Sequence, residues 1–431
     1  MSDIRFEGWL HRTGTGGVYQ DSAGNVGIAS TQPKTRLDIQ NGAFQIGPAG
    51  ICTATTVNTT NLINETSLSH RNLIINGAMQ VAQRGTSSTA GSGYHTIDRY
   101  SFNVGGTDET PTVAQVDVSS GTTPYTLGFK KALKITNGNQ TGGAGAADYM
   151  EIYQYLEDQD ISNSGWNFKS SSSYITVSFW IKSSVAQKFT GFFYTNQAGA
   201  GDSYMYSYQI DNGSGGSLTA DTWTKITHSI PGNSSLSFNN DNTRGLAVGI
   251  YQFNGTNYTT SDKAFNAWSA WDSSAKTRDM TSTWYTTNDA TLEITGLQLE
   301  VGSVATPFEH RSYGEQEIRC QRYYYRQSAA HQYMRYDCNG QCPSANGAQF
   351  VFSLPVRQRA NATIGYSALT DFYIYASNLQ SKTPTAITLS AGSTKSPMLS
   401  FDKSSTFSAG AGAHLTTPNS QQGYIEFIAE L

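Results

Sequence analysis

The amino-acid sequence predicts an all-β protein with a short fibrous N-terminal segment, a central jelly-roll-like antiparallel β-sandwich and a C-terminal β domain. Three observations support this fold class. Gly, Ser, Thr and Asn, which supply turns, are abundant, and Gly alone accounts for 42 of the 431 residues. Short runs of β-branched and aromatic residues recur at intervals typical of sandwiches. An aromatic share of 12% argues against the disorder that a polar, Gly-rich composition would otherwise indicate.

The chain is longer than one hydrophobic core usually organises, so we expect more than one domain. Residues 1–70 contain no long apolar run, and a single copy of them could hardly bury a core. Strand signals become strong at Arg71 and recur until about Arg311. The sequence therefore predicts a stalk over 1–70, a β-sandwich over 71–311, and a short helix followed by a distal β domain over 312–431.

Three runs carry the sandwich prediction. In Tyr174–Lys182 apolar and polar residues alternate, which is typical of a half-buried antiparallel strand. Leu246–Phe253 is apolar on both faces, as in a central strand that is covered on both sides. Thr291–Val301 changes its apolar phase at Gly296, and a β-bulge there would account for the change. Further strands are expected at 132–136, 150–156, 189–195, 204–210 and 222–228.

The third part is expected to begin with a helix. Ser312 and Glu315 have the spacing of a capping box, so the helix should run from Tyr313 towards Arg322. Strands should follow, because alternate residues of AQFVFSLPV, at 348–356, are apolar. Further strands are expected at 370–376, 387–389 and 424–431.

Charge and hydropathy exclude two partner classes. The net charge of −4 comes without any basic run, so the electrostatic footprint of a nucleic-acid-binding protein is absent. No stretch approaches the roughly 20 apolar residues of a membrane span, and the N-terminus lacks the apolar core of a signal peptide. We therefore expect a soluble protein made in a cytoplasm, with no nucleic-acid partner and no membrane insertion.

The four cysteines, Cys52, Cys320, Cys338 and Cys342, are too few and too dispersed for a disulfide scaffold. Free thiols are therefore expected. Cys338 and Cys342 lack the second pair of ligands that a zinc site needs, and an opportunistic disulfide there is the alternative.

The sequence predicts no catalytic residue. A glycoside hydrolase needs two carboxylates about 5 to 10 Å apart, but no acidic pair is distinguished by its spacing. We interpret acidic residues such as Glu157 and Asp158 as solvated loop charges. The histidines form no metal-ligand pattern, and no phosphate-binding loop or nucleophile elbow stands out. We therefore expect no enzyme activity, no cofactor and no protein-bound metal, although a structural metal on the axis of an assembly stays open.

Aromatic residues are the more promising functional groups. A sugar ring presents apolar C–H faces that stack on Trp or Tyr, while polar neighbours bind its hydroxyls. The polar stretch Phe265–Tyr285 lacks strand periodicity and holds three tryptophans and a tyrosine among small polar residues. The alternative role for these rings is to plug one end of the core. The candidate glycan-binding residues are Trp268, Trp271, Trp284 and Tyr285.

Two segments resemble stock phrases of the fibre proteins of tailed bacteriophages. NLIINGAMQVAQRG followed by YHTIDRY, within residues 71–100, resembles the first phrase. ITGLQLEVGSVATPFEHRSYGEQE followed by CQRYY, within residues 292–325, resembles the second. Both phrases occur in the family in this order and bracket a β-sandwich. Because the two phrases bracket the sandwich, we expect the polar and charged residues of the first phrase to close the domain rather than to bind a ligand. These residues are Asn76, Gln80, Gln83, Arg84, Asp98 and Arg99.

The N-terminal part carries a further resemblance. The segment made of Gly24–Ile28 and the following Arg36–Ile39 resembles a sequence phrase that is common in phage fibres and trimeric adhesins. It differs from this phrase at Ala29, where Gly is usual. Such segments usually become stable by chain association, so we expect a homotrimer. A flexible linker is the alternative.

The resemblance implies a virion fibre protein with a carbohydrate-binding-like module. We expect a tail fibre that lies on the virion surface after assembly in the host cytoplasm, contacts other virion proteins through its N-terminal segment and binds host-surface polysaccharide. A capsid or head appendage with the same fold is one alternative. A glycan-degrading tailspike is another, although the internal repeat usual in such spikes is not found in the sequence.

Overall fold

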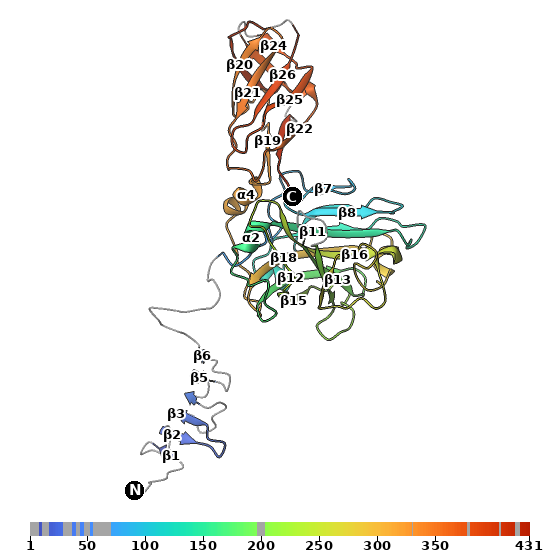
Figure 1. Ribbon diagram of the computed structural model, residues 1–431, viewed down its shortest axis with the longest axis vertical. Helices are drawn as coiled ribbons and strands as arrows, with labels where there is room; N and C mark the ends of the chain where they lie inside the picture. The colour runs from blue at the N-terminus through green and yellow to red at the C-terminus, as the bar shows by residue number, and fades with distance from the viewer. Residues whose placement is uncertain are drawn as a thin grey trace. The chain divides into compact units, whose positions relative to one another are not determined.

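The computed structural model describes residues 8–10, 17–28, 37–39, 44–46, 52–54, 70–195, 203–329, 331–376, 380–404, 407–418 and 423–431 (Figure 1). The chain divides into two compact units, Met1–Glu65 and Thr66–Leu431. Almost every described element is a strand, which confirms the predicted all-β class.

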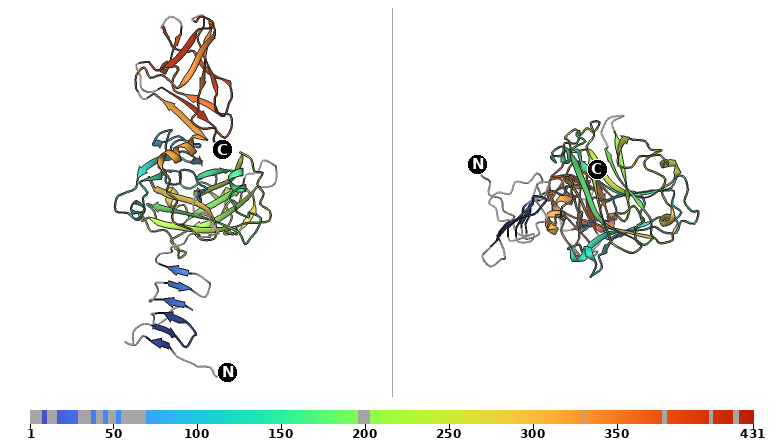
Figure 2. Two further views of the ribbon diagram at one scale, coloured as in Figure 1. Left: turned by 90° about the vertical axis from the view of Figure 1, so that its left-hand side faces the viewer. Right: turned by 90° about the horizontal axis from the view of Figure 1, so that it is seen from below.

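The first unit holds one sheet of short strands, which lie side by side in chain order in the left view of Figure 2. Neighbouring strands are antiparallel except β3 and β4, which are parallel. Val18 and Ile28 pair across β2 and β3, and each side chain is 40% exposed. The strands are β1 (Gly8–Leu10), β2 (Gly17–Gln20), β3 (Val26–Ile28), β4 (Leu37–Ile39), β5 (Phe44–Ile46) and β6 (Cys52–Ala54).

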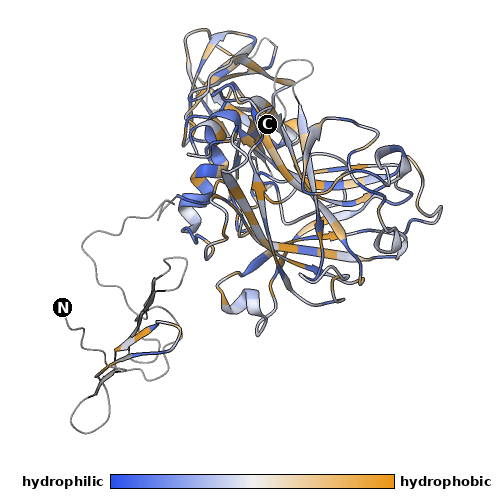
Figure 3. Ribbon diagram, turned by 60° about the horizontal axis from the view of Figure 1, so that its bottom comes forward, coloured by the Kyte–Doolittle hydropathy of each residue, from blue (hydrophilic) through white to orange (hydrophobic). Residues whose placement is uncertain are grey.

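The second unit begins with a sandwich of two six-stranded antiparallel sheets. The β12 sheet has the order β15-β12-β18-β10-β9-β7, and the β16 sheet has the order β17-β14-β13-β16-β11-β8. Hydropathy colouring shows apolar residues along the sandwich strands (Figure 3). The strands are β7 (Ser87–Ser88), β8 (Ser101–Gly105), β9 (Thr112–Asp117), β10 (Lys131–Thr136), β11 (Tyr149–Glu157), β12 (Tyr174–Ser183), β13 (Phe189–Thr195), β14 (Tyr204–Ile210), β15 (Thr224–Pro231), β16 (Arg244–Asn254), β17 (Trp268–Ala270) and β18 (Thr291–Val301).

Only short helical turns interrupt the described part of the sandwich. They are α1 (Thr123–Thr126), α2 (Asp158–Ser162), η1 (Thr256–Tyr258) and α3 (Thr283–Thr286). All the strands expected in this region are present. β16 is buried along nearly its whole length between β13 and β11, as expected for a central strand.

Strand β12 is more buried than predicted. The inward face of β12 is buried as expected, but Thr176 and Ser178, on the other face, are also buried. The chain after β18 covers them, since the Thr176 hydroxyl donates to the Gly302 carbonyl over 2.7 Å. The half-buried interpretation therefore fails for the first half of β12, whereas Trp180 and Lys182 on the same face are only partly buried. Alternation in a sequence does not show what covers the polar face.

The predicted bulge at Gly296 is confirmed. The register between β12 and β18 shifts opposite this residue, whose φ is +65°. A Cβ atom at Gly296 would lie 2.7 Å from a ring carbon of Phe129, so the bulge also lets this ring pack closely on β18.

The remainder of the second unit starts with α4 (Tyr313–Gln321), and the Ser312 hydroxyl accepts a hydrogen bond from the Glu315 amide, as the capping box predicts. A three-stranded sheet, β19-β28-β22, and a seven-stranded sheet, β24-β23-β27-β20-β21-β26-β25, follow. The expected strand at 348–356 ends early, at Phe352. The strands are β19 (Tyr324–Ser328), β20 (Cys338–Ser344), β21 (Gly347–Phe352), β22 (Thr363–Tyr366), β23 (Tyr373–Ala376), β24 (Gln380–Lys382), β25 (Ala386–Ala391), β26 (Met398–Asp402), β27 (Gly412–Thr416) and β28 (Tyr424–Ile428), with the turn η2 (Leu369–Asp371).

The two phrase-bearing segments contact each other directly. The Asn72 amide group donates to the Leu297 carbonyl over 3.1 Å and accepts from the Leu299 amide over 3.1 Å. The Glu309 carboxylate accepts from the Asn72 backbone amide over 2.8 Å. The segments therefore close the sandwich together.

The first phrase also joins the sandwich to the C-terminal sheets. Arg99 lies 3.4 Å from the ring centre of Tyr323 and pairs with Glu430. Arg84 lies 3.5 Å from the ring centre of Tyr324 and also pairs with Glu430, over 3.2 Å. Both arginines thus have structural roles. They were expected only to close the sandwich, but they also bind residues of the C-terminal part.

The acidic residues after β11 do not match their prediction either. Glu157 and Asp158 are buried, and Arg322 donates twice to the Glu157 carboxylate, over 2.6 and 2.7 Å. These residues are structural partners and not solvated loop charges.

Cys320, Cys338 and Cys342 are free thiols, as predicted. Cys338 and Cys342 are four residues apart on β20, hence about 13 Å apart, which is too far for a disulfide. The side chain of Cys52, like Ala29 and the 30–36 stretch, lies outside the described residues.

Candidate functional site

The structure separates the four aromatic candidates. Trp284 and Tyr285 lie on α3 and are 0% and 1% exposed. The Trp284 indole donates to the Thr291 carbonyl over 3.0 Å, and the Tyr285 ring stacks on Phe253. Neither ring can face a sugar, so their assignment as glycan-binding residues is corrected. They plug one end of the core, as the alternative interpretation held.

Trp268 and Trp271 belong to the edge of the β16 sheet. Trp268 begins β17, which is unexpected in a stretch without strand periodicity. Its indole donates to the Pro231 carbonyl over 2.8 Å and its ring packs against the core, so its role is largely structural. Trp271 is 37% exposed, and its ring centre lies 4.4 Å from that of Tyr194.

Trp271 lies at one side of a groove on the outer face of the β16 sheet, with a volume of about 230 Å³. Since alternate residues of a strand point to one face, β11, β13 and β16 each contribute every second side chain to its floor. The loop after β17 and strand β8 supply its polar end. The lining residues are Asn103, Glu151, Tyr153, Tyr155, Phe192, Tyr194, Ala247, Tyr251, Trp271 and Lys276.

Gly249 shapes the centre of the groove floor. It lies opposite Tyr153 on β11 and opposite Phe192 on β13. A Cβ atom at this position would be 2.5 Å from the Phe192 ring, so only glycine allows this ring to lie over the sheet. The Phe192 ring in turn stacks on Tyr251, with centroids 4.1 Å apart.

Polar side chains mark the Glu151 end of the groove. Asn103 donates to the Glu151 carboxylate over 2.8 Å, and the Lys276 ammonium lies 4.0 Å from its other oxygen. Burial raises the pKa of Glu151, while Lys276 and Asn103 oppose the rise. The Lys276 ammonium also lies 5.7 Å from the ring centre of Trp271. This end therefore combines a charged pair with an exposed aromatic face.

The other end of the β11 row holds Tyr155. Its ring centre is 5.1 Å from that of Tyr153 and 4.7 Å from the Arg244 guanidinium. Burial raises the pKa of the Tyr155 hydroxyl, which therefore stays protonated and can donate a hydrogen bond.

Of the residues that line the groove, the sequence predicted a glycan-binding role only for Trp271. A signal was present, because Tyr149, Tyr153 and Tyr155 alternate in YMEIYQYLE and share one face of the strand. What the sequence could not show is that the second sheet covers the opposite face of β11, and that on this face Tyr149 and Tyr153 stay partly accessible while Tyr155 is buried.

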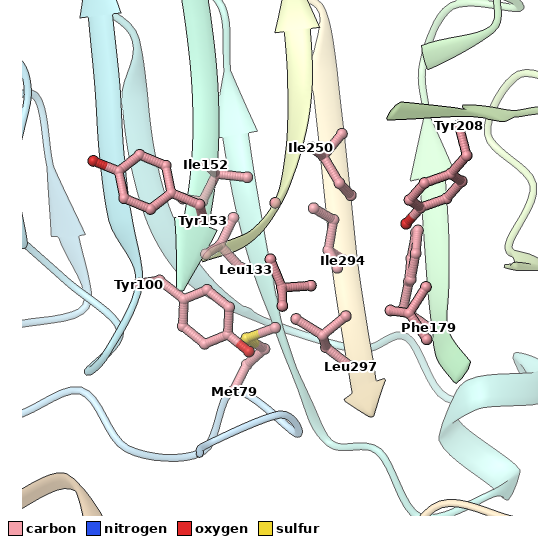
Figure 4. A pocket seen from close by; sticks show the side chains of 13 residues that line it. Met79, Tyr100, Leu133, Ile152, Tyr153, Phe179, Tyr208, Ile250, Ile294 and Leu297 are labelled. Carbon is pink, nitrogen blue, oxygen red and sulfur yellow. The ribbon is translucent and has the colours of Figure 1, made fainter. Parts of the chain in front are cut away.

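Two other hollows in the second unit are less suited to a sugar. Figure 4 shows the cavity between the sheets, near Met79, Tyr100 and Leu297, whose volume is about 20 Å³ and which is thus large enough for little more than a water molecule. A depression of about 540 Å³ on the outer face of the β12 sheet has no tyrosine in its lining. One of its lining hydroxyls, that of Thr306, already donates to the Glu300 carboxylate.

Within the described residues, no group of three or more His, Cys, Asp or Glu side chains is placed to hold a metal ion. None of the described helices has both the length and the apolar character needed to cross a membrane.

No family model matches the chain, and no curated protein matches it. Among solved structures, it is similar to the enzymatically active domain of tailspike protein 4 from bacteriophage CBA120, with a TM-score of 0.28 and 11% identity, over 54% of this chain and 21% of that one. A xylan-binding domain from Paenibacillus barcinonensis has a TM-score of 0.24 and 11% identity, over 54% and 96% of the two chains. The N-terminal cellulose-binding domain of a Cellulomonas fimi glucanase has a TM-score of 0.23 and 11% identity, over 52% and 99%. At these TM-scores the function must be argued from the site itself.

Proposed function

We propose that this protein is a bacteriophage virion fibre that binds host-surface polysaccharide in the groove on the outer face of the β16 sheet. The phage assignment rests on the two phrases resembling phage fibre segments, at residues 71–100 and 292–325. The observation that carries the binding function is the exposed ring of Trp271 together with the partly buried rings of Tyr153 and Tyr194. These rings lie beside the polar side chains of Asn103, Glu151 and Lys276. Such rings stack on sugar C–H faces, and the neighbouring polar groups bind hydroxyls.

The proposal is for binding, not cleavage. Glu151 is the one carboxylate among the described residues that line the groove, whereas most glycoside hydrolases use two. The raised pKa of Glu151 follows from its burial and needs no catalytic role. Incubating the protein with the polysaccharide that it binds and assaying for new reducing ends tests this part, and release of such ends would identify a tailspike enzyme instead.

The groove is tested with Trp271→Ala on an array of purified bacterial capsular and O-antigen polysaccharides. Loss of one exposed stacking ring should weaken binding about tenfold, or about 1.4 kcal/mol. Tyr366→Ala is the matched control, because Tyr366 is also 37% exposed but lies on β22, away from the groove. Equal binding by the two variants would contradict the assignment of the site.

We also propose that the fibre is a homotrimer held together through its first unit, and that this unit contacts other virion proteins. The exposed apolar pair Val18 and Ile28 supports association, because a neighbouring copy could cover it. Deleting residues 1–65 should lower the mass measured by light scattering from trimer to monomer. A monomeric mass for the full chain would refute the trimer.

A further inference from the structure

The groove described above has a cation in its lining at one end, and a second cation lies next to its lining residue Tyr155 at the other end. The Lys276 ammonium lies at the Glu151 end, and the Arg244 guanidinium lies over the ring of Tyr155. Glu151 and Tyr155 are four residues apart on β11, which places the two ends about 13 Å apart along the strand. A short oligosaccharide lying along β11 would therefore meet both cations.

The two cations differ in how far they are neutralised. Lys276 has the Glu151 carboxylate 4.0 Å away. Arg244 lies opposite Glu157 in the pairing of β16 with β11, but the Glu157 carboxylate is turned inward and held twice by Arg322. Among the ion pairs of the described residues, none includes Arg244. An exposed guanidinium without an ion-pair partner among the described residues thus lies beside the Tyr155 end of the groove.

We infer that the groove selects an acidic polysaccharide, one whose sugar units carry a carboxylate, and that Arg244 binds this carboxylate. The inference rests on the proposed glycan-binding function. A guanidinium is planar and always charged, and its paired N–H groups match the two oxygens of a carboxylate. The Tyr155 ring beneath Arg244 is buried, so at this place the guanidinium, and not the ring, is the group that a sugar would meet.

The experiment is an array of bacterial polysaccharides in which each acidic polymer is paired with its carboxyl-reduced, neutral form. Carboxyl reduction keeps the sugar linkages and removes the negative charge. The difference in affinity between the two forms therefore measures the contribution of the carboxylate to binding. The wild-type chain is compared with Arg244→Gln and with Lys169→Gln, which removes one exposed positive charge from the loop before β12. Oligosaccharides of the best-bound polymer are then titrated by calorimetry at low and high salt.

We expect the strongest ligand to be acidic and to lose about three- to tenfold in affinity on carboxyl reduction. Arg244→Gln should lose the same factor toward the acidic form only, and added salt should reduce the difference. Lys169→Gln should bind like the wild type. Equal binding of acidic and reduced polymers, or an unchanged preference in Arg244→Gln, would overturn the acidic selectivity while leaving glycan binding intact. Failure to bind any polysaccharide would instead overturn the proposed function.

Discussion

The two outer faces of the sandwich differ in what covers them. On the β12 sheet the chain after β18 folds back, and Glu300 accepts hydrogen bonds from the amide and hydroxyl of Thr306. On the β16 sheet, tyrosine and tryptophan rings line a groove. The second phrase, after β18, thus closes one face, whereas the other face carries the groove. Residues of both phrases, including Ile75 and Tyr323, pack in one buried cluster with part of the groove floor. A recognisable phrase therefore indicates the architecture, while the ligand site lies in less distinctive sequence.

The largest expected effect is on stability, and it distinguishes a tryptophan of the core from a tryptophan of the groove. Trp284→Ala removes a fully buried ring and should lower the free energy of unfolding by about 3–5 kcal/mol. Trp271→Ala, at an exposed position, should lower it by less than about 1 kcal/mol. Urea denaturation measures both, and similar losses would contradict the separation of the two tryptophans.

The next effect concerns the closure of the sandwich. Asn72→Ala should cost about 2 kcal/mol of stability or more, since it leaves the buried Leu297 carbonyl and Leu299 amide without side-chain partners. Asn139→Ala, at an exposed position, should change stability by less than about 0.5 kcal/mol. If both variants unfolded at the wild-type urea concentration, the phrase-bearing segments would not hold the domain together.

A smaller effect compares the two faces as binding surfaces. Trp180 lines the depression on the β12 sheet as Trp271 lines the groove on the β16 sheet. Polysaccharide affinity should fall about tenfold in Trp271→Ala and stay unchanged in Trp180→Ala. The opposite result in calorimetric titrations would move the site to the β12 sheet.

The last effect is a pH dependence of stability at a partly buried histidine. Burial lowers the pKa of His228 from 6.5 to about 4, and the imidazole bonds to the Tyr206 hydroxyl over 3.1 Å. Between these pH values the unfolded chain binds a proton that the folded chain does not, so stability should fall as the pH drops from 6.5 towards 4. His228→Gln should flatten this part of the profile, whereas the exposed His331→Gln should not. A profile of unchanged slope in His228→Gln would assign the acid sensitivity to other groups.

The sequence by itself determined the long central strands of the sandwich, the bulge at Gly296 and the capped helix after Ser312. Each of these depends on local rules: alternation within one strand, the φ freedom of glycine, and a side chain that bonds to its own helix. The resemblance also indicated which segments close the sandwich, although not their contacts with the C-terminal sheets.

Only the tertiary structure decided which face of each sheet stays accessible. Trp271 and Trp284 stand in the same polar stretch with the same local signals, yet one is exposed and the other is enclosed between the sheets. The same holds for Glu157, whose burial depends on Arg322, 165 residues away. Burial is a property of the residues that cover a side chain, and these come from distant parts of the chain.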